Sequence, residues 1–374
     1  MKSKSFYNKP MITITKEFEC TSPYDLSRFG EPEKLLFFDI ETTGLSAKQD
    51  MVYLIGCVYL RGGSWQMKQW FADSIHAEQE ILIHFFLFAS RFSTLIHFNG
   101  DTFDLPFLRE RTAHYQMPVP EKKPVSFDIY RKVRFLKKFL NLPDCRQKTL
   151  ESFLGIDRKD LYDGGQLIRF YWQYLRTGEA SLYEALLLHN EEDIQGLPFL
   201  LALLSYRDFF QGPFRTETEQ TSPCLAKDGA AGRELMVTCI NDSCSLPVPC
   251  SFSGINCQFS CHGNSLILRL PLLEGSLKYF FRDYTNYYYL PEEDRAIHKS
   301  VAAFVDKEHR KKATAKTCYQ NHTSLFFPVP KGICENYPLF YSEYKKNPPY
   351  MEYTKGLWTD SSFLQDFLLA TLPK

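Results

Sequence analysis

Short apolar runs and longer amphipathic segments alternate along the first half of the chain. Leu35–Phe38 is a run of four apolar residues, which is typical of a strand buried on both faces. Met51–Leu60 and Trp65–Ala72 are two further β-type runs, and the turn signal between them, Arg61–Ser64, favours a meander. Met11–Thr15 could form one more strand in the segment that precedes them.

Helix-forming patterns follow these runs. Ala77–Ser90 has the spacing and the length of a helix, and Thr94–Phe98 is another short strand of the buried type. The next helix is expected to begin soon after this strand, with Asp101 or Thr102 as its N-cap. Strands that alternate with helices predict a layered α/β domain.

The pattern changes in the rest of the chain. Phe127–Phe139 predicts a basic helix, and Ser181–Leu204 predicts a long amphipathic helix with a kink at Pro198. Periodicity is lost around Phe210–Ala231, where Gly, Pro, Ser and Thr accumulate, so we expect a linker there. From Glu234 onward the pattern is β-like, which predicts a second, smaller β-rich domain.

Acidic residues follow the first buried run directly. Asp39 and Glu41 are two positions apart, so on a strand they project from the same face. Two carboxylates side by side at the end of a buried strand repel each other and lose hydration, a cost that bound divalent cations would remove. The alternative is a strand end capped by surface acids.

Two further polar clusters occur on other predicted elements. The segment Asn99–Asp104 comes directly after a predicted strand, and His189 and Asp193 lie four residues apart on one helix face. A single helix histidine is more often a surface or core residue than a functional one, and Glu191 and Glu192 suit solvated positions. Together the three clusters predict one site, assembled from a strand end, a strand-to-helix junction and a late helix.

Three motifs in these clusters resemble those of a known family. DIETTG at 39–44, NGDTFDLP at 99–106 and HNEED at 189–193 are similar to the motifs of the DEDD exonucleases, which have an RNase H-like fold. The chain most resembles the YprB-type RNase H-like branch, whose signature extends through TLESFLGIDRKDLYDGG at 149–165. The resemblance covers roughly residues 35–206 and does not include the C-terminal region.

The resemblance also implies roles for single residues. It implies two divalent metal ions, Mg²⁺ or Mn²⁺, held by four carboxylates: Asp39, Glu41, Asp104 and Asp193. It implies that His189 orients or deprotonates the attacking water, although its four-residue spacing from Asp193 is that of the tyrosine subtype. Thr43, Leu45 and Asn99 are implied as contacts to the substrate.

The residues themselves fit this chemistry. Phosphodiester hydrolysis by two metal ions needs several carboxylates on converging rigid elements, and a neutral histidine can accept a proton near pH 7. The sequence has no G-x-S-x-G nucleophile pattern, and it also lacks the glycine fingerprints of P-loop and dinucleotide-binding proteins.

Basic residues suggest where a polyanionic substrate would lie. Arg131, Arg134 and Lys138 follow at three- and four-residue steps, so they form either a phosphate-binding track on one helix face or a solvated face. The run Lys307–Lys316, with the aromatic segment Tyr279–Tyr289, could hold single strands by charge and stacking. The alternative for that region is a β core of aromatic residues beside a soluble helix.

Composition limits the remaining choices. Lys+Arg and Asp+Glu both number 44, so the net charge is zero and any affinity for nucleic acid must come from local patches. The N-terminus lacks a signal-peptide core, and no apolar run approaches membrane-spanning length, so we expect a cytoplasmic protein without membrane contact. The 11 cysteines are therefore expected to be thiols. Five of them cluster near His262 without a C-x-x-C pair, which favours ordinary thiols over structural zinc: Cys239, Cys244, Cys250, Cys257 and Cys261.

The predicted fold class is α/β: an RNase H-like (exonuclease) mixed sheet flanked by helices, followed by a smaller β-rich C-terminal domain. The predicted parts are a lead-in (1–34), the exonuclease domain (35–207), a linker (208–231), the β-rich domain (232–330) and an aromatic tail (331–374). The predicted function is a metal-dependent nuclease, a 3′–5′ exonuclease acting on single-stranded ends of DNA or RNA. The alternative is a nucleic-acid-binding module of a helicase or repair complex with little or no activity of its own.

Overall fold

The computed structural model describes residues 11–118, 124–225, 231–254, 256–332 and 337–371. The chain divides into two compact units, Met1–Ser205 and Tyr206–Lys374, and each is described by itself. In the described part of the chain, no helix combines the length and the apolar character needed to cross a membrane.

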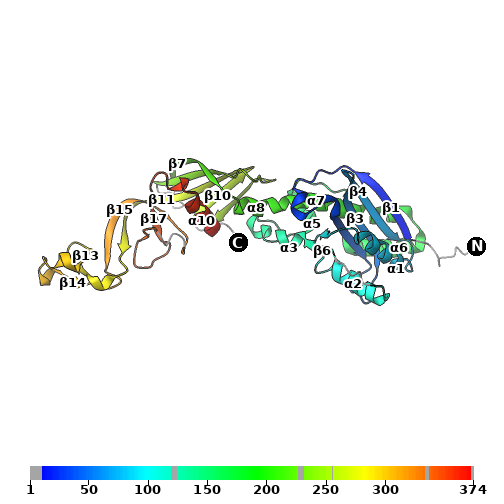
Figure 1. The fold of residues 1–374 in the computed structure, drawn as a ribbon, viewed down its shortest axis with the longest axis horizontal. Helices are drawn as coiled ribbons and strands as arrows, with labels where there is room; N and C mark the ends of the chain where they lie inside the picture. The colour runs from blue at the N-terminus through cyan, green and yellow to red at the C-terminus, as the bar shows by residue number, and fades with distance from the viewer. Residues whose placement is uncertain (1–10, 119–123, 226–230, 255, 333–336, 372–374) are drawn as a thin grey trace, which may run out of the picture. The chain divides into compact units, whose positions relative to one another are not determined.

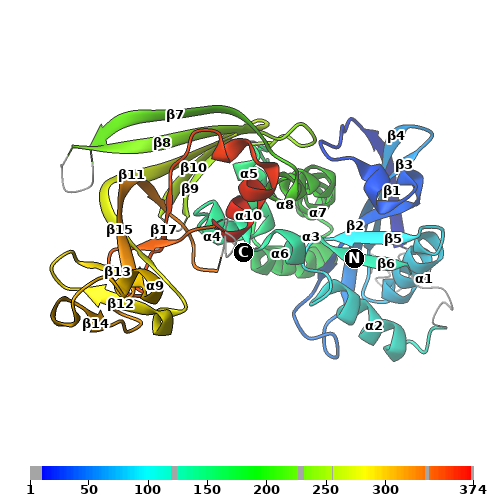
Figure 2. The ribbon, with the colours of Figure 1, turned by 60° about the vertical axis from the view of Figure 1, so that its left-hand side comes forward.

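The N-terminal unit is built on a six-stranded mixed sheet (Figure 1) with the order β1-β4-β3-β2-β5-β6, whose strands are all labelled in Figure 2. The strands are β1 (Met11–Phe18), β2 (Leu35–Thr42), β3 (Val52–Arg61), β4 (Ser64–Ala72), β5 (Thr94–His97) and β6 (Val125–Asp128). The first four are joined by antiparallel pairings, whereas β2–β5 and β5–β6 are parallel. The predicted meander of β2, β3 and β4 is confirmed, and the C-terminal ends of β2, β5 and β6 lie at one edge of the sheet.

Seven helices accompany this sheet among the described residues, and an eighth begins at the end of this unit and lies mostly in the second. They are α1 (Glu78–Ala89), α2 (Asp104–His114), α3 (Ile129–Val133), α4 (Leu136–Phe139), α5 (Gln147–Phe153), α6 (Gly164–Thr177), α7 (Ala180–Leu200) and α8 (Leu204–Gln211), which runs into the second unit. A capping box of Asp163 and Gln166 starts α6, and Gly178 in the left-handed conformation ends it. Pro198 lies in the last turn of α7, before a 3-10 turn at Leu201–Leu203.

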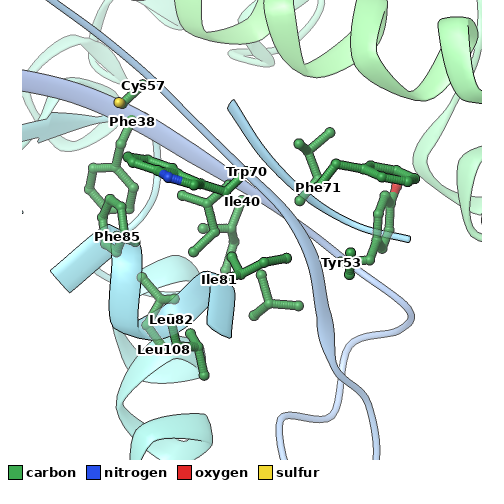
Figure 3. Packing of buried hydrophobic residues seen from close by; sticks show 14 of the residues in the cluster. Phe38, Ile40, Tyr53, Cys57, Trp70, Phe71, Ile81, Leu82, Phe85 and Leu108 are labelled. Atoms are coloured by element: carbon green, nitrogen blue, oxygen red, sulfur yellow. The ribbon is translucent and has the colours of Figure 1, made fainter. Parts of the chain in front are cut away.

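Large aromatic residues fill the core between the sheet and α1. Phe38 on β2 and Trp70 on β4 both pack against Phe85 of α1, with ring centroids 5.3 and 6.1 Å apart (Figure 3). Tyr53 of β3 stacks on Tyr171 of α6 at 4.3 Å. Strands buried in this way need apolar residues at consecutive positions, which explains the unbroken apolar runs in the sequence.

Two local predictions in this unit are wrong. The basic segment Phe127–Phe139 is not one helix, because residues 125–128 form β6 and the side chain of Asp128 caps the short helix α3. The first turn of α2 has no side-chain cap, and its N-cap position is Phe103. The Thr102 hydroxyl instead donates back to Asn99, so it closes the preceding turn.

The C-terminal unit is organised around the 16-residue strand β11 (Ser265–Phe280). One half of β11 pairs with β8 (Ala231–Ile240) and β10 (Cys257–His262), and the other half pairs with β15 (Tyr319–Pro328) and β16 (Phe340–Tyr341) (Figure 2). The remaining elements are β7 (Arg215–Leu225), β9 (Cys250–Gly254), β17 (Tyr350–Glu352), α9 (Lys299–Ala302), α10 (Ser361–Thr371) and a small sheet of β12 (Tyr287–Leu290), β13 (Arg295–His298) and β14 (Lys311–Lys312).

The expected irregular linker at 208–231 is wrong. Residues 208–211 are the end of helix α8, and Arg215–Leu225 form strand β7, which pairs with β8, whereas residues 226–230 lie outside the described residues. The strand lies at the edge of the sheet and combines partly buried with exposed residues, so its threonines and glutamates hide the apolar pattern of a strand. The aromatic tail belongs to the same unit, because β16 and β17 join the sheet and Trp358 packs against Phe363 and Phe367 of α10.

Candidate active site

Asp39 and Glu41 both lie on β2, two positions apart and therefore on one face. Gly56 of β3 is the cross-strand partner of Asp39. A Cβ at Gly56 would lie 2.0 Å from the side-chain oxygen of Asn190 on α7, so only glycine lets the helix approach this closely. The Asn190 amide then donates to Asp39 Oδ2 at 3.2 Å and ties α7 to the acidic end of β2.

Asp104 reaches the same place from another element. It is the first residue of α2 and is buried, and its Oδ1 accepts a hydrogen bond from the backbone N–H of Ile40 at 3.3 Å. Ile40 lies between Asp39 and Glu41 on β2. The loop after β5 therefore brings a third carboxylate beside the first two.

α7 completes the cluster with His189 and Asp193, which lie one turn apart. His189 Nε2 lies 3.5 Å from Glu41 Oε1 and 3.1 Å from Asp193 Oδ2. One potential ligand atom from each of these three residues lies within 4.8 Å of the others. The structure thus brings together all five residues predicted to be catalytic: Asp39, Glu41, Asp104, His189 and Asp193.

Without bound cations, full ionisation of these carboxyl groups is strongly unfavourable, because they are buried and lie close to one another. Burial, together with the charges of Asp104 and Asp193, raises the pKa of Asp39 well above its usual range. Burial raises the pKa of Glu41 to about 7, although His189 opposes this shift. Burial also raises the pKa of Asp104 to about 7. Crowded, largely desolvated carboxylates of this kind fit hard divalent cations, which would offset their repulsion.

Asp160 holds His189 from the side away from these acids. Its buried carboxylate oxygen Oδ2 lies 2.6 Å from His189 Nδ1 and also accepts from Lys148 Nζ at 2.7 Å. Glu192 fixes the loop by accepting the backbone N–H groups of Lys159 and Asp160, both at 2.9 Å. Asp160 lies within the segment 149–165 but has no role predicted from the sequence, and the solvated position predicted for Glu192 does not account for these two bonds.

Arg158 is a second neighbour of the site whose role was missed. Its guanidinium forms a buried ion pair with Glu151 of α5. Its Nη1 also lies 2.6 Å from Asp193 Oδ1, so the guanidinium is paired with both acids. Gln147 adds a hydrogen bond to the backbone oxygen of Asp193 at 2.7 Å, so α5 and its following loop fix this part of α7.

The residues implied as substrate contacts lie in different environments. Thr43 is buried, and its hydroxyl accepts from the backbone N–H of Met51. Leu45 is 86% exposed on the loop that follows β2. Asn99 has a positive φ of 63°, and its side-chain oxygen accepts from Thr102.

The predicted basic track is not a single helix face, because α3 and α4 are separate short helices. Arg131 is paired with Asp101 at 2.5 Å, and Lys138 is exposed. Arg134 instead lines a cavity of about 670 Å³, which we call the basic cavity. It is lined by Phe98, Asn99, Tyr130, Arg134, Phe135, Lys137, Asp144, Cys145 and Arg146. Lys137 and Arg146, which the sequence places as added charge close to the predicted track, also line this cavity, although they come from separate segments.

The basic cavity lies close to the acidic cluster along the chain and in the fold. Arg146 directly precedes Gln147, which bonds to the backbone of Asp193. Asn99 lies at the C-terminal end of β5, in the loop that leads to Asp104. Three basic residues beside one acid give the cavity a positive character next to the carboxylates.

Among the described residues, the cysteine cluster of the C-terminal unit does not form a group that could hold a metal ion. Cys250 and Cys261 face each other across β9 and β10, and their thiols interact. Within the described ranges, the one group of three or more His, Cys, Asp or Glu residues able to hold a metal ion is Glu41, His189 and Asp193.

Residues 36–205 match the family model of the RNase H superfamily. The N-terminal unit is therefore an RNase H-like domain, as its mixed sheet and flanking helices indicate, and a β-rich region follows it. No curated protein matches the chain.

Several solved structures are similar to the chain at low identity. The family B DNA polymerase from the archaeon Pyrobaculum calidifontis has 13% identity and a TM-score of 0.37, over 68% of this chain and 35% of the polymerase. Zinc-bound E. coli exonuclease I with single-stranded DNA has 15% identity and a TM-score of 0.27, over 55% and 54%. Apo exonuclease I has 15% identity and a TM-score of 0.28, over 56% and 57%. The chain thus spans about a third of the polymerase and just over half of the exonuclease I chains.

Proposed function

We propose that this chain is a metal-dependent nuclease, a 3′–5′ exonuclease of the DEDD type and of the YprB-type branch, which hydrolyses phosphodiester bonds in DNA or RNA. The observation that carries the proposal is the convergence of four carboxylates and one histidine from β2, α2 and α7. These elements are far apart in sequence, so a shared position at one sheet edge is not a consequence of local sequence.

The carboxylates are the proposed holders of two divalent ions, Mg²⁺ or Mn²⁺. Asp39, Glu41, Asp104 and Asp193 provide the oxygen ligands that such ions prefer. Bound ions would activate water at neutral pH and stabilise the charge that develops on the phosphate. The raised pKa values of Asp39, Glu41 and Asp104 support this assignment, because the site without cations is electrostatically strained.

His189 is the proposed general base. A carboxylate only accepts hydrogen bonds, so Asp160 takes the proton-bearing Nδ1 of His189 as its donor. The neutral imidazole then has its lone pair on Nε2, the atom that faces Glu41 and Asp193. In this orientation His189 can take a proton from a water molecule that attacks at the acidic cluster.

The basic cavity supports a polynucleotide as the substrate. Arg134, Lys137 and Arg146 offer cations to the phosphates, and Phe98 and Tyr130, whose ring centroids lie 5.6 Å apart, offer aromatic surface to the bases. The exposed Leu45 lies on the loop after the catalytic strand, where it can contact the terminal nucleotide. A single-stranded end fits these contacts best, because its bases are free to stack.

One contact favours a second candidate function. The guanidinium of Arg158 lies against Asp193 and competes with any cation for that carboxylate. If Arg158 stays paired with Asp193 and keeps metal ions from that carboxylate, the same domain would bind nucleic acid with little hydrolysis, as a module of a helicase or repair complex.

Hydrolysis of labelled oligonucleotides separates these functions. Single- and double-stranded DNA and RNA, labelled at either end, are incubated with purified protein and Mg²⁺, Mn²⁺ or EDTA. The proposal predicts metal-dependent shortening from the 3′ end, and Asp39→Asn must remove it. Binding without metal-dependent hydrolysis would support the second candidate, and shortening from the 5′ end would overturn the polarity.

A further inference from the structure

The C-terminal unit contains a cavity of about 740 Å³ where β11 ends, within the size range of ligand pockets. Its walls are mostly aromatic, and we call it the aromatic cavity. The lining includes Tyr279, Phe280, Phe281, Tyr284, Tyr341 and Tyr344. None of these residues belongs to the proposed active site, so the cavity needs an explanation of its own.

Ring contacts hold the walls of the aromatic cavity in place. Phe280 lies 5.3 Å from Tyr344 and 6.2 Å from Tyr341, measured between ring centroids. These tyrosines are partly exposed, and Tyr284 is 39% exposed. Among the residues that the structure describes, the hydroxyls of Tyr284, Tyr341 and Tyr344 have no hydrogen-bond partner. Fixed rings with free polar tips suit a flat ligand that both stacks and forms hydrogen bonds.

Two cations border these rings. Arg282 and Lys345 are exposed and line the cavity, and neither forms an ion pair within the described ranges. Lys345 Nζ lies 5.2 Å from the ring centre of Tyr344, so charge and stacking surface are adjacent. Asp283 is the one acid among the lining residues described. The cavity therefore complements a ligand that joins flat rings to negative charges.

We propose that the aromatic cavity is a binding site for single-stranded nucleic acid, with bases on the tyrosine rings and phosphates at Arg282 and Lys345. Sites that hold single strands combine aromatic side chains with cations in this way. Proline-rich peptides also bind aromatic grooves, but a neutral peptide would leave both cations unengaged. The choice of ligand rests on the proposed nuclease function, whereas the site is separate from the catalytic residues.

Fluorescence anisotropy with the full chain tests the site. Labelled oligo(dT) and oligo(U) of about 16 nucleotides are titrated in EDTA, which prevents metal-dependent cleavage. Tyr344→Ala should weaken binding by about 5–150-fold, the usual effect of losing one stacked base, and Arg282→Glu should also reduce the salt dependence. Matched controls outside the cavity are Phe304→Ala, at a side chain 92% exposed, and Lys355→Glu, at an exposed lysine. The same losses are expected in an Arg134→Glu background, which weakens the basic cavity.

Each outcome decides between the two proposals. If the cavity variants and the controls bind the oligonucleotides with equal affinity, the aromatic cavity is not a binding site for single strands. The nuclease proposal is unaffected by that result. If the cavity variants bind the oligonucleotides more weakly but the wild type never hydrolyses nucleic acid, the proposed binding site is supported and the nuclease proposal is overturned. Preference for a proline-rich peptide over both oligonucleotides also overturns the site proposed here. If the cavity variants lose more affinity for oligo(dT) than for oligo(U), the site prefers DNA, and the reverse result indicates RNA.

Discussion

The carboxylate of Asp160 and the imidazole of His189 form a hydrogen bond of 2.6 Å between Oδ2 and Nδ1. The aspartate is itself fixed, because it accepts from Lys148 Nζ, and Glu192 binds the backbone of its loop. The histidine therefore cannot rotate freely, and its Nε2 stays directed at the acidic cluster. If His189 acts as the proposed base, it therefore loses little conformational entropy when the substrate arrives.

Asp160→Asn should lower kcat by about 10–100-fold, the usual cost of losing a group that orients a functional histidine. KM should change little, because Asp160 does not line the basic cavity. Steady-state kinetics on a short oligonucleotide gives both constants. Asp157→Asn, at an exposed acid in the same loop, is the matched control and should behave like the wild type. Equal kcat in the two variants would contradict a positioning role for Asp160.

Gly56→Ala should damage the site through α7. The added methyl would lie 2.0 Å from the Asn190 side-chain oxygen, and the displaced asparagine could no longer donate to Asp39. Such overpacking costs about 1–3 kcal/mol, so the thermal midpoint and the hydrolysis rate should both fall. Gly164→Ala is the control, because nothing lies within 4 Å of its Cβ. Wild-type stability and activity in Gly56→Ala would show that the helix has room to move.

The parts of the fold predicted from sequence share one physical property. β2 and β3 are buried on both faces, so their residues had to be apolar, and the acids that interrupt β2 were conspicuous. The edge strand β7 is not buried on both faces, so its residues need not be apolar, and its sequence pattern predicts a linker instead of a strand. α3 and α4 are too short to show a helical period.

The residues of the candidate site also fall into those that the sequence could group and those that only the fold brings together. Residues within a motif, such as Asp39 and Glu41, could be grouped by spacing alone. Asp160 touches His189 only after the chain has folded, and 29 positions separate the two. The basic cavity likewise joins Arg134 to Arg146 across a turn that no periodicity predicts.

The metal-free protein should become less stable as the pH rises from about 4 to about 7. Asp39, Glu41 and Asp104 have pKa values raised above the ordinary carboxyl values near 4, so the folded state binds more protons than the unfolded state in this window. The raised pKa of His189, where nearby carboxylates outweigh burial, acts in the same direction. Thermal midpoints in EDTA at several pH values measure the effect.

Asp39→Asn serves as the control for this pH dependence. It should raise the midpoint near pH 7.5 and flatten the pH dependence, because it removes one of the crowded charges. Mg²⁺ or Mn²⁺ should stabilise the wild type and have a smaller effect on the variant. A wild-type midpoint that rises with pH across the window would refute the electrostatic description of the site.

Arg134→Glu should raise KM for long oligonucleotides and leave kcat nearly unchanged. Arg134 lines the basic cavity and is not one of the residues of the acidic cluster, so we expect it to contribute to binding and not to the hydrolytic step. Lys138→Glu makes the same charge change at an exposed lysine outside the lining and is the control. The salt dependence of binding should weaken only in Arg134→Glu. If both variants raise KM equally, the substrate follows the surface of the short helices and not the cavity.

His189→Ala should lower the hydrolysis rate by about 10²–10⁴-fold, the usual contribution of a positioned base. The imidazole lies between Asp160 and the carboxylates of Glu41 and Asp193, so its removal takes away the group proposed to accept the proton of the attacking water. His189→Tyr should retain part of the activity, because the four-residue spacing from Asp193 suits a tyrosine in the related subtype. Rates at saturating Mn²⁺ separate loss of the base from loss of metal affinity. A loss below about tenfold in His189→Ala, with unchanged metal dependence, would exclude His189 as the base and leave activation of the water to the metal ions alone.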